Sequence, residues 1–319
     1  MSDMLIQNVQ NYEKSEISGE FHEFTYKTDD ISGQNWRMML GDSCERLTEI
    51  EENSVDFSVY SPPFMSLYTY SPSERDLGNS RGEQEFFDQY AFIIRELLRT
   101  TKPGRLTAVH VAQVPAMLSR DNYIGLKDFR GKTIQAYING GWIHHGEIVI
   151  DKDPQAQAIR TKSKGLLFTQ MHKDSAWSRP ALADFIVIFR KPGENAVPIN
   201  PDIGNDEWIE WARPIWYNIR ESDTLQYTTA REKNDERHIC PLQLETIERC
   251  IRLWSNPGET VLSPFTGIGS EGYESVRLGR KFIGIELKEA YFNQAVKNLK
   301  NIEAETKLPT LFDIDNFTE

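Results

Sequence analysis

The chain has 319 residues, enough for one large α/β domain or two smaller ones with a packed core. It is 39% hydrophobic and 26% charged, and it contains no apolar run of about 18 residues, which argues against a membrane-spanning helix. The polar, acidic start does not resemble a signal peptide, and three scattered cysteines indicate neither a zinc site nor a disulfide framework, so we expect a cytoplasmic protein without a metal.

The first half of the chain alternates apolar strands with helical patterns. Residues 1–34 lack a clean periodicity and predict an N-terminal arm or a covering strand. Residues 54–60 form an apolar run that must end at Ser61-Pro62-Pro63, because two prolines cannot continue a central strand. Residues 85–101 predict an amphipathic helix. Three further runs predict buried strands: 105–111, 146–150 and 184–189.

In the second half, the alternation of strands and helices is interrupted and then resumes. Residues 192–237 are rich in proline and tryptophan, including Trp208, Trp211 and Trp216, and we interpret them as an inserted recognition region. The remaining predicted elements are a helix over 241–254, a strand over 260–262, a glycine-rich loop leading into a helix, a strand over 281–285 and a helix over 288–300, followed by an acidic tail.

Alternating strands and helices predict a mostly parallel sheet with both faces covered. Ligands of such sheets bind at the carboxyl ends of strands, which here directs attention to the loops after Tyr60 and Leu262.

The later loop, Thr266-Gly267-Ile268-Gly269-Ser270, is typical of a nucleotide-binding turn, since glycines let the backbone approach a ligand and the following helix start offers free N–H groups. Glu286 follows Gly267 by nineteen residues and ends the next strand, where an acid can meet ribose hydroxyls. The alternative is an ordinary strand-to-helix turn, with Glu286 capping a helix.

The earlier loop is Ser61-Pro62-Pro63-Phe64. The Ser61 hydroxyl and the Pro62 carbonyl can accept hydrogen bonds from an exocyclic base amine and favour a pyramidal nitrogen with an available lone pair. Phe64 can stack on the base. Taken alone, such a tetrapeptide can also be a plain turn.

Together these motifs resemble the DNA amino-methyltransferases, in the permuted class whose catalytic loop precedes the cofactor loop. The resemblance covers residues 39–299 and rests on Gly41-Asp42, Asn53-Ser54-Val55-Asp56, Ser61-Pro62-Pro63-Phe64, His238 with Pro241 and Gln243, Ser263-Pro264-Phe265-Thr266-Gly267 and Lys281–Glu286. It implies a Rossmann-like, mostly parallel, seven-stranded sheet with a target-recognition insertion, and S-adenosylmethionine as the methyl donor.

The resemblance also implies a division of the chain and a set of site residues. The expected regions are an arm (1–34), a catalytic half (35–191), a recognition region (192–237), a cofactor-binding half (238–300) and a tail (301–319). The catalytic residues are Ser61, Pro62, Pro63 and Phe64. The expected cofactor-binding residues are Asp42, Pro241, Gln243, Ser263, Phe265, Thr266, Gly267, Gly269, Ser270 and Glu286. Ser263 departs from the aspartate usual in the family, which leaves its contact with the cofactor open.

The net charge of −12 argues against a nucleic-acid partner, but residues 152–191 hold eight basic and three acidic residues, a local charge of +5. We interpret this stretch as facing double-stranded DNA; a solvated loop with a chance excess of charge is the alternative. The loop after Phe64 lines a base pocket or is a surface loop with its aromatics packed inward. The predicted DNA-binding residues are Tyr68, Arg75, Arg160, Lys162, Lys164, Lys173 and Arg179.

In the family that the sequence resembles, serine at the first position of the tetrapeptide mostly accompanies transfer to the N4 amine of cytosine, so the resemblance implies this target, with the N6 amine of adenine as the alternative. The base must be flipped out of the duplex to react. Related folds methylate RNA or a glutamine side chain, and a DNA-binding subunit without catalysis is a further possibility. A homodimer is consistent with the family resemblance.

Overall fold

A computed structural model describes residues 27–64, 77, 82–116, 121–161, 164–226 and 241–307. Its main feature is a nine-stranded sheet in the order β1-β2-β11-β10-β3-β4-β8-β7-β9, and β5 pairs with β6 separately. The strands are β1 (Asp29–Ser32), β2 (Trp36–Leu40), β3 (Val55–Tyr60), β4 (Thr101–Ala112), β5 (Val114–Ala116), β6 (Gly125–Lys127), β7 (Ile143–Ile150), β8 (Asp184–Arg190), β9 (Ile215–Trp216), β10 (Thr260–Ser263) and β11 (Lys281–Glu286).

The centre of the sheet is parallel, as predicted. Strands β2, β11, β10, β3 and β4 run in one direction, and β8 pairs antiparallel with both β4 and β7. These seven strands confirm the mostly parallel sheet, but the expected count of seven is too low for the described residues. Short edge strands extend it: β1 pairs antiparallel with β2, and β9 pairs parallel with β7. Strand β1 places residues 29–32 at one edge of the sheet, whereas residues 1–26 lie outside the described part.

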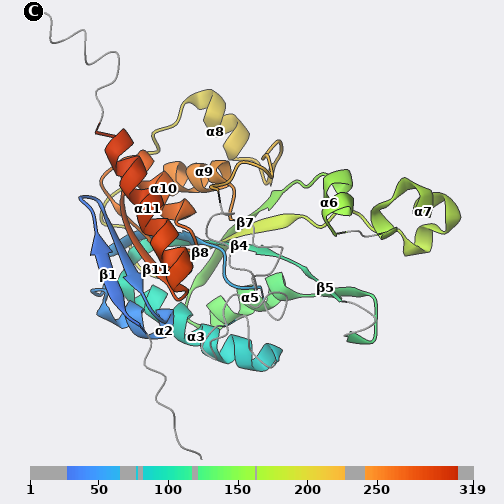
Figure 1. Cartoon of the computed structure of the whole chain (residues 1–319), viewed down its shortest axis with the longest axis horizontal. Coiled ribbons are helices and arrows are strands. Elements are labelled where there is room, and N and C mark those ends of the chain that lie inside the picture. Colours follow the sequence, from blue (N-terminus) through green and yellow to red (C-terminus); the bar gives the residue numbers. More distant parts are fainter. Residues whose placement is uncertain are drawn as a thin grey trace, which may run out of the picture.

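Helices cover both faces of the sheet (Figure 1). Helices α9, α10 and α11 pack on one face, and α3 and α5 pack on the other. The α-helices are α2 (Ser43–Arg46), α3 (Glu83–Thr100), α5 (Phe129–Asn139), α6 (Pro154–Thr161), α7 (Phe168–Lys173), α8 (Asn205–Trp211), α9 (Leu244–Trp254), α10 (Ser270–Arg277) and α11 (Glu289–Glu305). Short 3-10 turns are η1 (Leu47–Glu49), η3 (Lys164–Leu166) and η4 (Ser175–Trp177).

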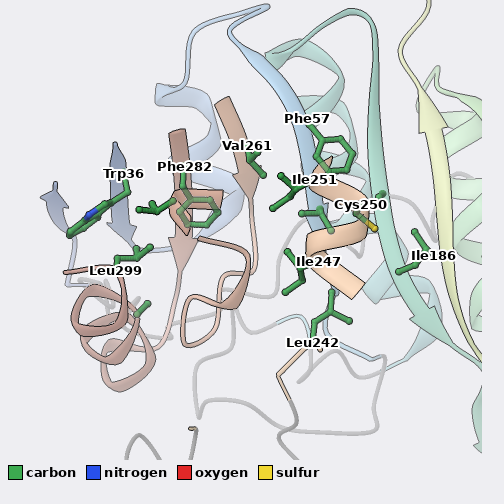
Figure 2. Close-up of a cluster of buried hydrophobic side chains, with 14 of the residues drawn as sticks. Trp36, Phe57, Ile186, Leu242, Ile247, Cys250, Ile251, Val261, Phe282 and Leu299 are labelled. Carbon is green, nitrogen blue, oxygen red and sulfur yellow. The ribbon is translucent and has the colours of Figure 1, made fainter. Parts of the chain in front are cut away.

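The core beneath α9–α11 fixes the strands that end at the two motifs. Phe57 of β3, Val261 of β10 and Phe282 of β11 are buried there against Ile251 of α9 and Leu299 of α11 (Figure 2). Burying each such side chain contributes about 1.5–3 kcal/mol to stability. The carboxyl ends of these strands are therefore held in register by a continuous apolar layer.

Helix α3 confirms the predicted amphipathic helix to within two residues at its start and one at its end. Its buried face packs on the second layer of core, and it ends where Thr101 adopts an extended conformation. The buried side chains of this face are Phe86, Tyr90, Ile93, Ile94 and Leu97.

Several element boundaries differ from the sequence-based expectation; β7, for example, begins at Ile143 rather than at Gly146. Strand β4 begins at Thr101 rather than after Gly104. Helix α9 begins at Leu244 rather than Pro241, because Gln243 is still extended, with ψ of 135°. Helix α11 continues to Glu305, so the expected tail from Asn301 is helical for its first five residues.

Two of the three tryptophans in the 192–237 region belong to the core rather than to an exposed surface. Trp211 and Trp216 are buried, and the Trp216 indole donates a hydrogen bond to the Trp211 carbonyl oxygen at 2.8 Å. The Arg249 guanidinium of α9 lies over both rings. Trp208, by contrast, is 57% exposed. The segment from α8 to β9 is thus integrated into the domain, while residues 227–240 lie outside the described part.

A different segment projects from the domain. Residues 151–161 and 164–183 lie between the end of β7 and the start of β8 and carry α6, η3, α7 and η4; in Figure 1 these elements extend away from the sheet on the side opposite α11. We call this segment the β7–β8 extension. Among the described residues, no helix combines the length and apolarity needed to cross a membrane.

Candidate active site

The two motifs lie side by side because their strands are neighbours. Strands β3 and β10 pair in parallel, with Val261 opposite Phe57 and Leu262 opposite Ser58. Their carboxyl ends open into one pocket, which also borders the ends of β2 and β11. The residues that line it are Asp42, Ser43, Ser61, Pro62, Pro63, Phe64, Leu77, Ile93, Pro241, Leu242, Pro264, Phe265, Thr266, Gly267, Ile268, Ser270, Glu271, Glu286, Leu287, Lys288 and Tyr291.

All four predicted catalytic residues line this pocket, and so do seven of the ten residues predicted to bind the cofactor: Asp42, Pro241, Phe265, Thr266, Gly267, Ser270 and Glu286. Gln243, Ser263 and Gly269 are not part of the lining. Ser263 is completely buried, and neither its hydroxyl oxygen nor the Gln243 Oε1 has a hydrogen-bond partner among the described residues.

The Glu286 carboxylate organises the glycine-rich loop. Its Oε2 accepts a hydrogen bond from the Gly267 amide at 2.8 Å, and its Oε1 accepts one from the Lys288 amide at 2.8 Å. Gly267 and Gly269 have positive φ angles of 55° and 91°. A Cβ at Gly269 would lie 3.1 Å from the Cα of Ala295 in α11, so this position requires glycine.

The pocket has polar groups suited to a bound polar ligand. The Ser270 hydroxyl oxygen is buried and has no hydrogen-bond partner among the described residues. Burial, with a smaller contribution from Glu286, raises the pKa of Glu271 to about 8. Besides Glu271, which this pKa keeps mostly protonated at neutral pH, two acids (Asp42 and Glu286) and one base (Lys288) line the pocket, and this balance suits a cationic ligand. Among the described residues, no group of three or more His, Cys, Asp or Glu side chains could hold a metal ion.

Ser61 begins a chain of polar contacts that was missed from the sequence. Its Oγ lies 3.0 Å from Nδ1 of His110 and 3.4 Å from the His110 carbonyl oxygen. On the other side of the ring, Nε2 of His110 lies 3.2 Å from Oδ2 of Asp184, which Lys152 approaches to 2.7 Å. Burial alone would raise the pKa of Asp184, but His110 and Lys152 lower it to about 2.

Phe64 lies between His110, which belongs to these polar contacts, and Phe129 of α5. Its ring meets the His110 ring edge-on with centroids 6.3 Å apart, and it meets Phe129 edge-on at 5.8 Å. The ring is partly buried and lines the pocket. Phe64 is therefore held by its neighbours and still borders the space that a ligand would enter.

Below Ser61, three tyrosines support the end of β3. The Tyr60 hydroxyl bonds to the Tyr90 hydroxyl at 2.8 Å and to the Tyr137 hydroxyl, and all three side chains are buried. Phe265 of the cofactor loop packs on Tyr60, with ring centroids 5.7 Å apart. This contact joins the two motif loops directly.

The predicted DNA-binding residues are only partly placed. Tyr68, Arg75 and Lys162 lie outside the described residues, as do the side chains of Arg160 and Lys164. Lys173 is exposed on α7, whereas Arg179 is partly buried and donates to the Pro180 carbonyl oxygen.

The local charge of +5 overstates the positive surface of this stretch. Lys152 is buried against Asp184. Arg190 donates to the carbonyl oxygens of Gly104 and Gly193, and Lys191 donates to that of Thr101. Together with Arg179, four of the eight basic residues thus make internal contacts, which composition alone does not reveal.

Comparison with known proteins identifies the family of the chain. A family model described as DNA methylase matches residues 55–297. M1.MboII, a type II methyltransferase of Moraxella bovis, is 42% identical over 274 residues, which cover 81% of this chain and 94% of that protein.

Two solved structures share the fold. TTHA0409 of Thermus thermophilus, solved with S-adenosyl-L-methionine, has a TM-score of 0.61 at 22% identity, covering 83% of this chain and 94% of that one. The PvuII DNA methyltransferase, which is cytosine-N4-specific, has a TM-score of 0.60 at 18% identity, covering 86% and 93%. Because the family model spans most of the sequence and M1.MboII is well above 30% identical, the chain belongs to the DNA methylase family of N6 and N4 amino-methyltransferases.

Proposed function

We propose that the chain transfers a methyl group from S-adenosylmethionine to the N4 amine of cytosine at specific sites in double-stranded DNA. The observation that carries this proposal is the single pocket in which Ser61, Pro62 and Phe64 face the glycine-rich loop. Membership of the DNA methylase family supports the reaction and the polymer. The type II relative M1.MboII supports a role beside a restriction enzyme.

The cofactor side of the pocket is built by the glycine-rich loop and the acids around it. S-adenosylmethionine supplies an electrophilic methyl group on a sulfonium centre. Glu286 holds the Gly267 amide in place and borders the pocket, where its carboxylate can accept from ribose hydroxyls. Ser270 offers a buried hydroxyl without a partner among the described residues. The acidic lining favours the positive charge of this cofactor, and the similar structure TTHA0409 binds it.

The substrate side orients the amine. Ser61 Oγ and the Pro62 carbonyl oxygen can accept the two N–H groups, which directs the nitrogen lone pair toward the methyl group. Phe64 stacks on the flipped base and is prevented from turning away by His110 and Phe129. Positioning of this kind accounts for much of the acceleration in a direct displacement.

The choice of cytosine N4 over adenine N6 rests on Ser61. In the family that this sequence resembles, serine at the first position of the tetrapeptide accompanies cytosine transfer, and aspartate accompanies adenine transfer. A neutral hydroxyl is sufficient because the amine becomes acidic as it gains the methyl group, so a strong base at this position is not required.

The test is mass spectrometry of nucleosides from unmethylated DNA of high sequence diversity, incubated with the protein and isotopically labelled S-adenosylmethionine. We expect labelled N4-methylcytosine from the wild-type chain and at least about 100-fold less from Ser61→Ala, with unchanged cofactor affinity. Labelled N6-methyladenine would overturn the assignment of the base. Label in RNA or protein but not in DNA would overturn the assignment of the substrate, and cofactor binding without any labelled product would indicate a non-catalytic subunit.

A further inference from the structure

Behind Ser61, three further side chains continue a series of polar contacts, which we call the polar chain. Ser61 contacts His110, His110 contacts Asp184, and Asp184 contacts Lys152, with distances of 3.0, 3.2 and 2.7 Å. Side-chain exposure is 10% for His110, 18% for Asp184 and 3% for Lys152. These residues come from β4, β8 and the segment after β7, so the sheet order brings them together.

The neighbours of the imidazole determine its tautomer. Asp184 forms an ion pair with Lys152 at 2.7 Å, and its carboxylate can only accept hydrogen bonds. The Nε2 contact with this carboxylate is close but too bent for a well-aligned hydrogen bond, yet a ring N–H at this position still faces an anion. The proton of the neutral ring therefore belongs on Nε2, which leaves Nδ1 as an acceptor.

With Nδ1 of His110 as an acceptor, the direction of its hydrogen bond with the Ser61 hydroxyl follows. The oxygen lies closer to Nδ1 of His110 (3.0 Å) than to the carbonyl oxygen of the same residue (3.4 Å), so the hydroxyl donates to the ring. The lone pairs of Ser61 then remain available to accept from a group in the pocket. This is the orientation that an amine substrate needs.

We propose that His110 is the acceptor of the proton that the base amine loses, reached through Ser61. As the nitrogen forms its bond to the methyl group, the methyl–sulfonium bond breaks. The amine N–H proton then passes to Ser61 Oγ while the Ser61 hydroxyl proton passes to Nδ1 of His110. The products are a neutral methylated amine, a neutral serine and an imidazolium. This inference rests on the proposed amine methylation.

Asp184 and Lys152 complete the arrangement. The imidazolium formed at His110 lies against the Asp184 carboxylate, which stabilises its charge. Lys152 compensates the Asp184 charge before the reaction and holds the carboxylate in place. Within the described part of the chain, the ring is in contact with Ser61, Phe64 and Asp184. His110 and Asp184 are positioning residues here, since they act on the substrate through Ser61.

The first measurement does not require turnover. Nitrogen NMR of the protein labelled with ¹⁵N-histidine reports which ring nitrogen carries the proton. We expect Nε2–H for His110, with the Nδ1 signal shifting in Ser61→Ala but not in the control His144→Asn, which alters a histidine on β7, separated from β4 by β8. A ring protonated on Nδ1 would overturn the proposed path, whether or not the protein methylates DNA.

The second measurement separates proton acceptance from packing. In single-turnover methyl transfer, His110→Ala should be slower by about 100-fold or more, with cofactor affinity within about threefold of wild type. His110→Asn keeps an acceptor for Ser61 near the Nδ1 position but cannot take up a proton, so it should stay slow. Added imidazole should restore part of the rate to His110→Ala and none to Ser61→Ala.

Asp184→Asn is expected to lower the rate as well, whereas His144→Asn should leave it unchanged. A wild-type rate in His110→Asn would show that only orientation matters and would overturn the proton path. Failure of the wild-type chain to label any nucleic acid would instead refute the proposed function, and the NMR result would remain a separate test of the polar chain.

Discussion

The Gly267 amide donates a 2.8 Å hydrogen bond to the Glu286 carboxylate, although nineteen residues separate the two in the sequence. The same carboxylate accepts from the Lys288 amide, so one side chain fixes both the cofactor loop and the start of α11. The acid at the end of β11 thus shapes the binding loop in addition to bordering the pocket.

We expect Glu286→Gln to weaken binding of S-adenosylmethionine by about 10-fold or more, because a hydrogen bond to a charged group contributes about 1.5–3 kcal/mol. The amide must also turn one NH2 group toward a backbone donor. Isothermal titration calorimetry checks the affinity. Glu289→Gln, three residues later and half-exposed, is the matched control, and an equal loss in that variant would contradict the role of Glu286.

Phe64→Ala should reduce kcat/KM for DNA by about 10- to 100-fold, in line with about 1–3 kcal/mol for one stacked base. Cofactor affinity should change little, since the ring contacts His110 and Phe129 rather than the glycine-rich loop. Steady-state kinetics with methylatable duplex test this. Phe92→Ala removes an exposed phenylalanine from α3 and should leave the kinetics unaltered.

Tyr60→Phe should lower the free energy of unfolding by about 1–2 kcal/mol, because two buried hydroxyls, those of Tyr90 and Tyr137, lose a shared partner. Urea unfolding followed by tryptophan fluorescence measures the change. Tyr217→Phe alters a half-exposed tyrosine and serves as the reference. Equal stability of the two variants would show that the buried hydroxyls find other partners.

Glu271 makes stability depend on pH in a defined direction. Its pKa rises from 4.5 to about 8 on folding, mainly through burial, so the folded chain favours the protonated form. The stability associated with that proton is complete below about pH 4.5 and is lost as the pH rises toward 8.

Glu271→Gln, which stays neutral, should therefore melt close to wild type at about pH 5 and at a higher temperature at about pH 9, with a gain of about 1–3 kcal/mol. Thermal unfolding without cofactor at both pH values tests this. Glu305→Gln, exposed at the end of α11, controls for the loss of one surface charge. A difference in melting temperature between Glu271→Gln and wild type that stays constant with pH would contradict the raised pKa of Glu271.

The β7–β8 extension should contribute to DNA affinity through its remaining basic residues. We expect the variant Lys173→Glu to bind duplex DNA more weakly and to reduce the magnitude of the salt slope by roughly 1, for one phosphate contact. Fluorescence anisotropy over a salt series measures both. Lys300→Glu on α11, at the other side of the molecule (Figure 1), should leave the slope unchanged.

The sequence was sufficient for features encoded by local patterns. Apolar runs located β3, β10 and β11, and the double proline and the glycines located the loops that follow them. Since parallel strands end at one edge of a sheet, most of the predicted catalytic and cofactor residues were expected to meet there, and they do.

Contacts between residues far apart in the sequence could not be predicted from such local patterns. His110, Asp184 and Lys152 meet because β4, β8 and β7 are neighbours, an order that no local spacing encodes. For the same reason, the sequence did not distinguish the buried Lys152 from the exposed basic residues that follow it. Trp216 looked like part of a recognition surface because its pairing in β9 depends on Ile150 of β7, 66 residues earlier.

The two ends of the β7–β8 extension join adjacent antiparallel strands. Ile150 pairs with Asp184, and Lys152 forms an ion pair with the same aspartate. A segment that leaves and re-enters a sheet at neighbouring points can be exchanged as a cassette without rebuilding the sheet. Recombination between related enzymes, or deliberate grafting, can therefore replace residues 153–183 while the strands on either side keep their pairing. The junctions must retain Lys152 and Asp184, because a graft that removes either one also removes support from the residue behind Ser61.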